Sequence, residues 1–175
     1  GIGRYNAMVS AEESVETAWS QVENQYQRRS DLIPNLVETV KGYAAHERET
    51  LEGVMAARAR ATQVVIDPAN ATAEQIASYQ AAQGELTQAL GRLMAVAEAY
   101  PDLKANENFM NLQSQLEGTE NRITVARNNF NEVARAYNTM IRRFPTNIIA
   151  SVFGFEKKPY FEAQDGAEVA PQVKF

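Results

Sequence analysis

The apolar side chains between Phe109 and Phe144 recur every three or four residues, and this repeat constrains the fold more than any other feature. Steps that alternate between three and four average 3.5 residues, the spacing of helices that pack nearly parallel with a left-handed supercoil. A helix of this length cannot bury its single stripe alone, so other helices must pack against it. With Asn106 as the expected cap, a helix is predicted over about 106–144. The stripe comprises Phe109, Leu112, Leu116, Thr119, Ile123, Ala126, Phe130, Val133, Tyr137, Met140 and Phe144.

Six prolines divide the chain into long proline-free stretches. Proline lacks an N–H and clashes with the preceding helical turn, so it marks places where helices start or end. A break is predicted between Ser30 and Pro34, with Asp31 as the cap of the helix that follows. Thr72 and Gln75 have the form of a capping box. Apolar residues at helical spacing then predict three more helices, over about 6–30, 34–65 and 72–100.

The short connections between these segments make consecutive helices antiparallel neighbours. The sequence therefore predicts an all-α fold, an antiparallel up-and-down four-helix bundle of long helices over 6–144 with an irregular C-terminal tail. Residues 145–163 are too apolar for a free linker, and we expect this aromatic tail to pack back on the bundle. Residues 164–175 contain glycine, proline and mixed charges, and we expect a mobile C-terminus there.

Residue counts exclude most kinds of catalytic and binding site. His46 is the only histidine and there is no cysteine, which excludes histidine-based triads, paired-histidine metal motifs and thiolate chemistry. Phosphate-binding glycine loops are also absent. The net charge of −5, with basic and acidic residues interspersed, provides no field for nucleic acid. We expect no enzyme activity, no cofactor, no metal ion and no nucleic-acid partner.

Four charged residues fall on stripes that are otherwise apolar, namely Glu12, Arg29, Glu47 and Arg58. Buried charges need partners. The interpretation we favour is an internal polar layer that fixes the register of the bundle. The alternative is a polar pocket that receives a small ligand.

The run between Gln27 and Leu36 supports two interpretations. In the structural one, it forms a tight corner in which Asp31 caps a helix and an arginine bonds helix-end carbonyls. In the functional one, it is a partner-docking epitope at one end of the bundle, made of Gln27, Arg28, Arg29, Asp31, Pro34 and Asn35. The aromatic tail has a similar pair of interpretations, because it packs on its own bundle or binds a membrane surface or partner.

Several runs have the form of motifs known from one bacterial family. They are Tyr5-Asn6, Ala18-Trp19, Gln27 to Ala44, His46-Glu47, Tyr100 to Ala105, Gly118 to Ile123, Ala126-Arg127, Tyr137-Asn138 and Phe144-Pro145. Through these runs the chain resembles the LemA family over essentially its whole length. The resemblance implies a four-helix bundle that follows an N-terminal transmembrane helix, and it supplies no catalytic residue.

No run here reaches the roughly 18 to 20 apolar residues that span a bilayer. Since the resemblance implies an anchor, we expect one ahead of Tyr5 that this sequence lacks, and hence a membrane localisation. No Lys or Arg lies between Arg4 and Arg28, whereas Glu12, Glu13, Glu16 and Glu23 do. The positive-inside rule then favours an extracytoplasmic or periplasmic domain.

Taken together, these features favour a non-enzymatic, membrane-tethered scaffold or adaptor with protein partners at the membrane. An oligomeric structural protein is the first alternative, because a 3.5-residue repeat also drives association between bundles. A small-ligand receptor that uses the polar layer is the second.

Overall fold

The computed structural model describes residues 2–143 and 146–161, and this part of the chain contains helices and no strand. The all-α prediction is confirmed. The predicted mobile C-terminus, residues 164–175, lies outside the described residues, as do position 144, the predicted end of the bundle, and positions 145, 162 and 163 of the predicted tail. The helices are α1 (Ile2–Lys41), α2 (Arg48–Gln63), α3 (Ala73–Ala97), α4 (Pro101–Lys104), α5 (Glu107–Arg142) and α6 (Thr146–Phe153).

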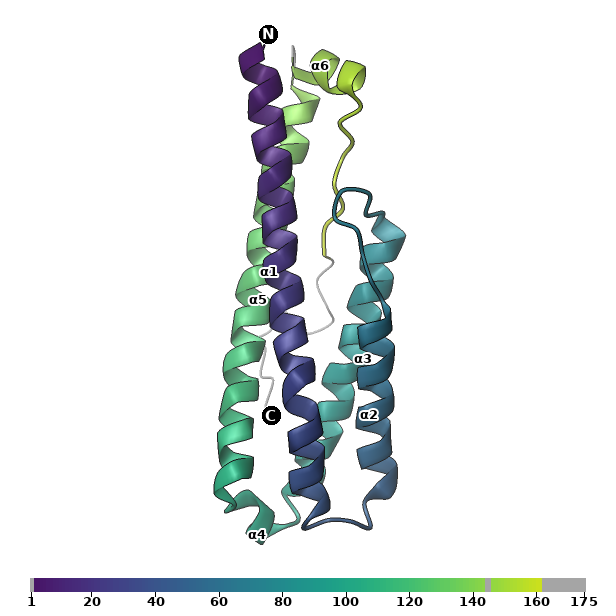
Figure 1. Ribbon diagram of the computed structural model, residues 1–175, viewed down its shortest axis with the longest axis vertical. Coiled ribbons are helices and arrows are strands. Elements are labelled where there is room, and N and C mark those ends of the chain that lie inside the picture. The colour runs from purple at the N-terminus through teal and green to yellow at the C-terminus, as the bar shows by residue number, and fades with distance from the viewer. Residues whose placement is uncertain (1, 144–145, 162–175) are drawn as a thin grey trace.

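The molecule is a rod whose two halves are built differently (Figure 1). Helices α1 and α5 run antiparallel along its whole length. Helices α2 and α3 flank them mainly in the half that is lower in Figure 1, where α4 closes the base, and the start of α3 reaches into the other half. In the upper half, α6 and the irregular segment 154–161 lie beside α1 and α5. We call these parts the lower and the upper half.

The predicted break between Ser30 and Pro34 is wrong, because α1 continues through Pro34 to Lys41. Proline at this position leaves the carbonyl of Ser30 without its helical donor. The guanidinium of Arg58 supplies one instead, with Nε donating to that carbonyl at 2.8 Å. The helix therefore survives its proline, and Asp31 lies inside it rather than at a cap.

The first turn of the chain comes at residues 42–47, so the predicted helix over 34–65 is also wrong. Its first part belongs to α1 and its remainder is the shorter α2. The turn begins where the N–H groups of Gly42 and Ala44 donate to the carbonyls of Glu38 and Val40. Glycine has low helix propensity, which favours an end at this point.

The two caps predicted from local sequence are confirmed. Thr72 and Gln75 form a reciprocal capping box at the start of α3. The side chain of Asn106 accepts a hydrogen bond from the Phe109 N–H at 2.9 Å at the start of α5. The third helix ends earlier than predicted, at Ala97, and Pro101 opens the short α4.

The lower core is almost entirely aliphatic, with a single phenylalanine among its buried residues. Side chains from α1, α2, α3 and α5 share it, and helix-borne leucines and alanines fill the space between four neighbours. The buried members are Ile33, Leu36, Val37, Val40, Ala44, Leu51, Val54, Ala57, Ala61, Leu86, Ala89, Leu90, Leu93, Met94, Ala97, Leu103, Phe109, Leu112 and Leu116.

The upper core is rich in aromatic residues. Trp19 is fully buried at its centre, stacked on Phe161 at 5.7 Å between ring centroids and edge-on to Phe130 at 5.6 Å. Phe161 comes from the segment after α6, so this segment completes a core that α1, α5 and the start of α3 leave open. The buried members are Met8, Val15, Ala18, Trp19, Val22, Tyr26, Ile66, Ile76, Tyr79, Ile123, Ala126, Phe130, Ala134, Tyr137, Ile141, Ala150 and Phe161.

Candidate functional site

A buried arginine joins the two halves. The guanidinium of Arg29 has no solvent exposure and donates to four acceptors on α3 and α5. Its Nη1 bonds Thr87 Oγ1 at 2.7 Å and Glu120 Oε2 at 3.1 Å, and its Nη2 bonds the carbonyl and the side-chain oxygen of Gln83, each at 2.9 Å. The charge of Arg29 is thus paired within the protein, as a buried cation requires.

Aromatic side chains flank this cluster on the upper side. The guanidinium of Arg29 lies 5.2 Å from the ring centroid of Tyr26, which contacts Tyr79 edge-on at 5.5 Å. Burial raises the pKa values of both tyrosine hydroxyls, so both rings stay neutral at physiological pH. A hollow of about 250 Å³ beside them is lined in part by Glu23, Tyr79 and Gln83.

The other predicted layer residues lie at different levels. Arg58 bonds the Ser30 carbonyl, one residue along from Arg29. Glu12, in the upper half, accepts a hydrogen bond from the Tyr137 hydroxyl at 3.2 Å and lies 3.5 Å from Lys158 Nζ. Glu47, at the base, accepts from the Tyr100 hydroxyl at 3.1 Å. The structure therefore brings Arg29 and Arg58 to one level and places Glu12 and Glu47 in separate clusters.

The predicted docking residues lie within the C-terminal half of α1, not at a corner. Arg29 is buried, whereas the other five are exposed. Gln27 donates to Asp31 at 2.9 Å one turn along, and Asn35 accepts from Asn108 on α5 at 3.3 Å. The exposed positions 27, 31 and 34 follow one face of the helix.

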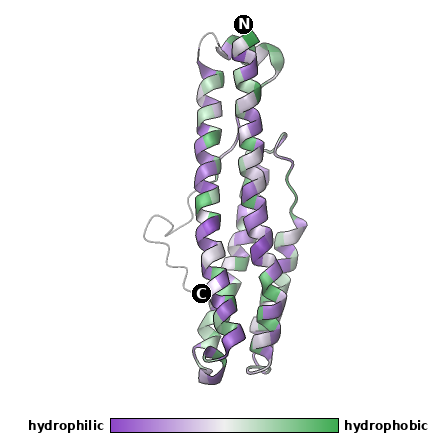
Figure 2. Cartoon of the chain, turned by 60° about the vertical axis from the view of Figure 1, so that its left-hand side comes forward, coloured by the Kyte–Doolittle hydropathy of each residue, from purple (hydrophilic) through white to green (hydrophobic). Residues whose placement is uncertain are grey.

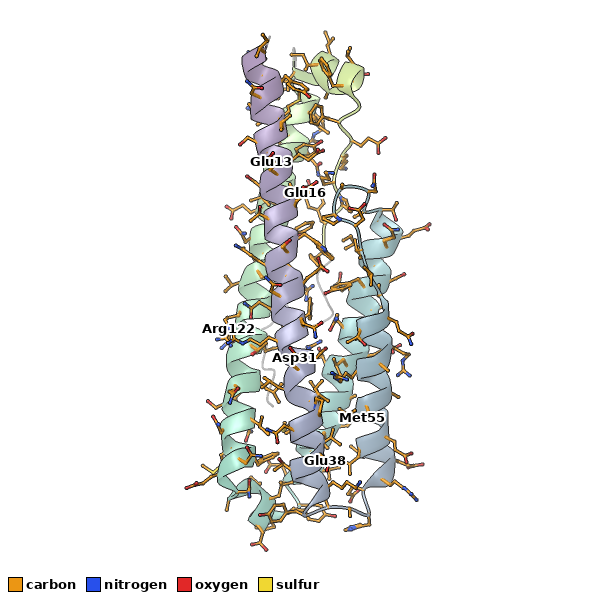
Figure 3. All side chains as sticks on the ribbon, in the orientation of Figure 1. Glu13, Glu16, Asp31, Glu38, Met55 and Arg122 are labelled. Atoms are coloured by element: carbon orange, nitrogen blue, oxygen red, sulfur yellow. The ribbon has the colours of Figure 1, made fainter. Side chains whose placement is uncertain are left out.

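Pro34 lines a groove of about 810 Å³ between α1 and α2. Asp31 and Glu38 on α1 and Met55 on α2 point to the same side of the molecule (Figure 3). The groove combines apolar walls with charges of both signs. Its lining is Pro34, Val37, Glu38, Lys41, Ala45, His46, Arg48, Leu51, Glu52 and Met55.

Sequence reasoning missed this groove between α1 and α2, because it assigned residues 34–41 to the second helix instead of the first. It also missed Asn131 and Asn138 on α5, which bind the segment after α6. Lys158, which lies in that segment and pairs with Glu12, was missed as well. A signal was present, since the two asparagines lie one heptad apart beside the apolar stripe of α5.

Within residues 2–143 and 146–161, no three of His, Cys, Asp and Glu gather closely enough to hold a metal ion. His46 is largely exposed, and its Nε2 lies 2.7 Å from the Tyr100 hydroxyl at the base of the rod. None of the described helices has a stretch that is long and apolar enough to cross a membrane.

Comparison with known proteins gives consistent matches over almost the whole chain. A family model described as "LemA family" matches residues 18–175. Magnetosome protein MamQ 2 of Paramagnetospirillum magneticum is 29% identical over 197 aligned positions, which cover 97% of this chain and 70% of that protein. Magnetosome protein MamQ of Magnetospirillum gryphiswaldense is 29% identical over 190 positions, with the same coverage. Protein LemA of Metamycoplasma hominis is 23% identical over 164 positions, which cover 94% of this chain and 71% of that protein.

Proposed function

The chain belongs to the LemA family, and on that premise we propose that it is a non-enzymatic scaffold or adaptor tethered to a membrane at the upper end of the rod. In this proposal the anchor that the family resemblance implies precedes α1. The lower half, which we take as an antiparallel four-helix bundle, presents the α1–α2 groove to a protein partner.

One observation carries the membrane part of this proposal. Four large apolar side chains are exposed at the end of the rod where α1 begins: Ile2 (81%), Ile148 (54%), Val152 (73%) and Phe153 (59%). Phe153 contacts Tyr5 at 4.7 Å between ring centroids, and Arg4 donates to Thr146, so α6 is fixed beside the start of α1. Figure 2 shows α6 as an apolar cap on this end. Apolar side chains gathered at an anchored end suit the interface of a bilayer.

The shape of the rod supports the adaptor part. At 1.5 Å per residue, the 40 residues of α1 span about 60 Å, so the groove at the lower end would stand well clear of the bilayer. Inside the rod, the side chain of Arg29 bonds those of Thr87, Gln83 and Glu120, which suits a structural element better than a catalyst or a ligand receptor. The MamQ relatives are named as magnetosome proteins, and we propose a comparable role among membrane-bound proteins for this chain. The absence of Lys and Arg between Arg4 and Arg28, next to the proposed anchor, supports an extracytoplasmic or periplasmic side.

The membrane end can be tested with single-cysteine labelling, because the chain contains no cysteine. An N-terminal polyhistidine tag holds the chain on phosphatidylcholine vesicles that contain a nickel-chelating lipid. An environment-sensitive dye is attached at Val152→Cys, and in a matched variant at Val125→Cys, which is similarly exposed (68%) on the side of α5. We expect the emission to shift to the blue and strengthen at position 152 and to stay unchanged at 125. Equal responses at both positions would contradict a membrane-facing end.

The adaptor role is tested in the full-length protein in its own cells. A photo-crosslinking amino acid replaces Met55 in the groove or, as the control, Met110, which is exposed on α5 in the lower half. We expect one partner protein to be captured repeatedly from position 55 and not from position 110. The same set of products from both positions would count against the groove as the docking surface.

A further inference from the structure

Two asparagines on α5 bind the backbone of the segment that follows α6. Asn138 Nδ2 donates to the Lys158 carbonyl at 2.8 Å, and Asn138 Oδ1 accepts from the Lys158 N–H at 2.6 Å. Asn131 repeats the pattern on Phe161, with distances of 3.2 Å and 2.8 Å. A carboxamide has the donor and acceptor of a peptide group, so it can pair with both polar groups of a residue whatever its side chain.

The spacing of these contacts matches an extended peptide. Seven residues of helix rise about 10.5 Å, and three residues of extended chain span about 10 Å. Asn131 and Asn138 are seven apart, and the residues they hold are three apart. The distance between the two asparagines on α5 therefore matches the distance between two residues three apart in an extended segment. Pro159 lies between the two contacts and, having no N–H, needs no further acceptor there.

The segment after α6 lies in a groove between α1 and α5, where two of its side chains have specific surroundings. The first of these two side-chain sites accepts a cation. Lys158 is buried, with Nζ 3.3 Å from the Ala69 carbonyl, 3.5 Å from Glu12 Oε2 and 5.7 Å from the Tyr137 ring centroid. Asn138 Nδ2 also donates to the Tyr160 hydroxyl at 2.8 Å. A carboxylate, a carbonyl and an aromatic face together suit an ammonium group.

The second pocket accepts an aromatic ring. Phe161 stacks on Trp19, lies edge-on to Phe130 at 5.4 Å between centroids, and has the guanidinium of Arg127 5.1 Å from its ring centroid. The groove thus has two backbone contacts, one cation pocket and one aromatic pocket, three residues apart along its ligand. This is the composition of a peptide-recognition site.

We propose that this groove between α1 and α5 is a binding site for extended peptides with a cation and, three residues on, an aromatic ring. Its resident ligand is the chain's own Lys158 to Phe161, and its occupant in trans is the same segment of a second copy. The segment is joined to α6 through Gly154 to Lys157, which lie outside any helix. Phe155 packs on Tyr5 and Tyr137, and the other three residues of this linker are exposed. A second copy offers identical contacts, so exchange costs mainly the entropy of association and is favoured at high concentration.

Trp19 reports directly on the aromatic pocket, because it is the only tryptophan. The variant Phe161→Ala empties the pocket in the full chain, and a synthetic peptide of residues 156–161 is titrated in, with excitation selective for tryptophan. We expect a saturable return of the Trp19 emission toward that of the unsubstituted chain. A peptide with alanine in place of Phe161 should give at least a tenfold weaker response. The further substitution Asn138→Ala in the protein should abolish the response, with circular dichroism showing that the helices persist.

Exchange between copies is tested in solution with two complementary variants. Phe161→Ala has a sound groove and a defective ligand, whereas Asn138→Ala has a sound ligand and a defective groove. Mixing them at high concentration should produce a one-to-one dimer in light scattering, while either variant alone stays largely monomeric. Absence of peptide binding would overturn the site, and peptide binding without the mixed dimer would overturn a second copy as its occupant. Neither measurement involves a membrane, so failure here is distinct from failure of the proposed tether.

Discussion

The lower and the upper half of the rod bury their cores by different means. In the lower half, four helices surround the core, and leucine, valine and alanine fill the narrow space between them. In the upper half, α1 and α5 continue and only the start of α3 reaches the core, through Ile76 and Tyr79. Large aromatic rings and the segment after α6 close the rest of this core. The comparison shows that side-chain size compensates for missing helices. Trp19, Phe130 and Phe161 span a distance that pairs of leucines would leave open.

Arg29→Ala should have the largest effect on this comparison, because Arg29 bonds α1 to α3 and α5 where the halves meet. Its removal leaves the Glu120 carboxylate without the Arg29 donor and removes the bonds from Arg29 to Thr87 and Gln83. We expect the free energy of unfolding to fall by about 3–5 kcal/mol, as when one member of a buried ion pair is removed. Urea denaturation followed by circular dichroism measures this. Arg28→Ala, one position along on the exposed face, is the control, and an equal effect of both would show that Arg29 does not hold the halves together.

Leu90→Ala and Phe161→Ala should separate the two cores. Leu90 is fully buried among four helices, and its truncation should cost about 2–5 kcal/mol of stability. Amide hydrogen exchange should then accelerate in both halves. Phe161→Ala should accelerate exchange mainly at amides of α1 and α5 in the upper half, since the segment after α6 can detach while the lower core stays packed.

This pair of results would also show whether the halves unfold together. If Phe161→Ala accelerated exchange in α2 and α3 as much as Leu90→Ala does, the rod would behave as one cooperative unit. The distinction between the cores would then be one of composition alone.

The sequence predicted what depends on neighbouring residues. The all-α fold follows from apolar spacing, and the caps at Thr72 and Asn106 follow from side chains that reach only three residues along the chain. The predicted break at Pro34 was wrong because the group that supplies the missing donor, the Arg58 guanidinium, lies 28 positions along the chain from the Ser30 carbonyl that it bonds. A local rule for proline cannot include a donor that arrives by tertiary packing.

The candidate sites show the same limit. Glu12, Arg29, Glu47 and Arg58 were identified as charges on apolar stripes, and each does bond a specific group. Their positions at different heights along the rod depend on where α1 ends. Pro34 led to a wrong prediction of that end. The partnership of Asn131 and Asn138 with the backbone of residues 158 and 161 requires the path of the segment after α6, and no local pattern supplies that.

Arg58→Ala tests how α1 tolerates its proline. The Ser30 carbonyl is buried in a residue with 1% exposure, and leaving it without a donor should cost about 1–3 kcal/mol. In a Pro34→Ala background the new N–H can bond that carbonyl, so Arg58→Ala should cost clearly less there. Urea denaturation of the double-mutant cycle measures the difference.

The matched control for that cycle is Arg60→Ala on the same helix. Arg60 forms an exposed ion pair with Glu85 at 3.0 Å, which should contribute less than about 1 kcal/mol in either background. Equal costs of Arg58→Ala with and without Pro34 would show that the guanidinium does not replace the missing helical donor.

Two glycines provide the smallest test of the contrast between helical and irregular chain. Gly91 lies inside α3 on an exposed face with open space around an added Cβ, so Gly91→Ala should stabilise the protein by about 0.5–1 kcal/mol. Gly154 lies where α6 ends and the segment that fills the groove between α1 and α5 begins, and it has a φ of 75°. Open space around its Cβ does not help there, because an L side chain resists this backbone conformation, and Gly154→Ala should destabilise by about 1–2 kcal/mol. Thermal melts that showed stabilisation by both substitutions would mean that the chain after α6 can continue as helix, and the upper half would then lose the sharp reversal that directs Lys158 and Phe161 toward α5.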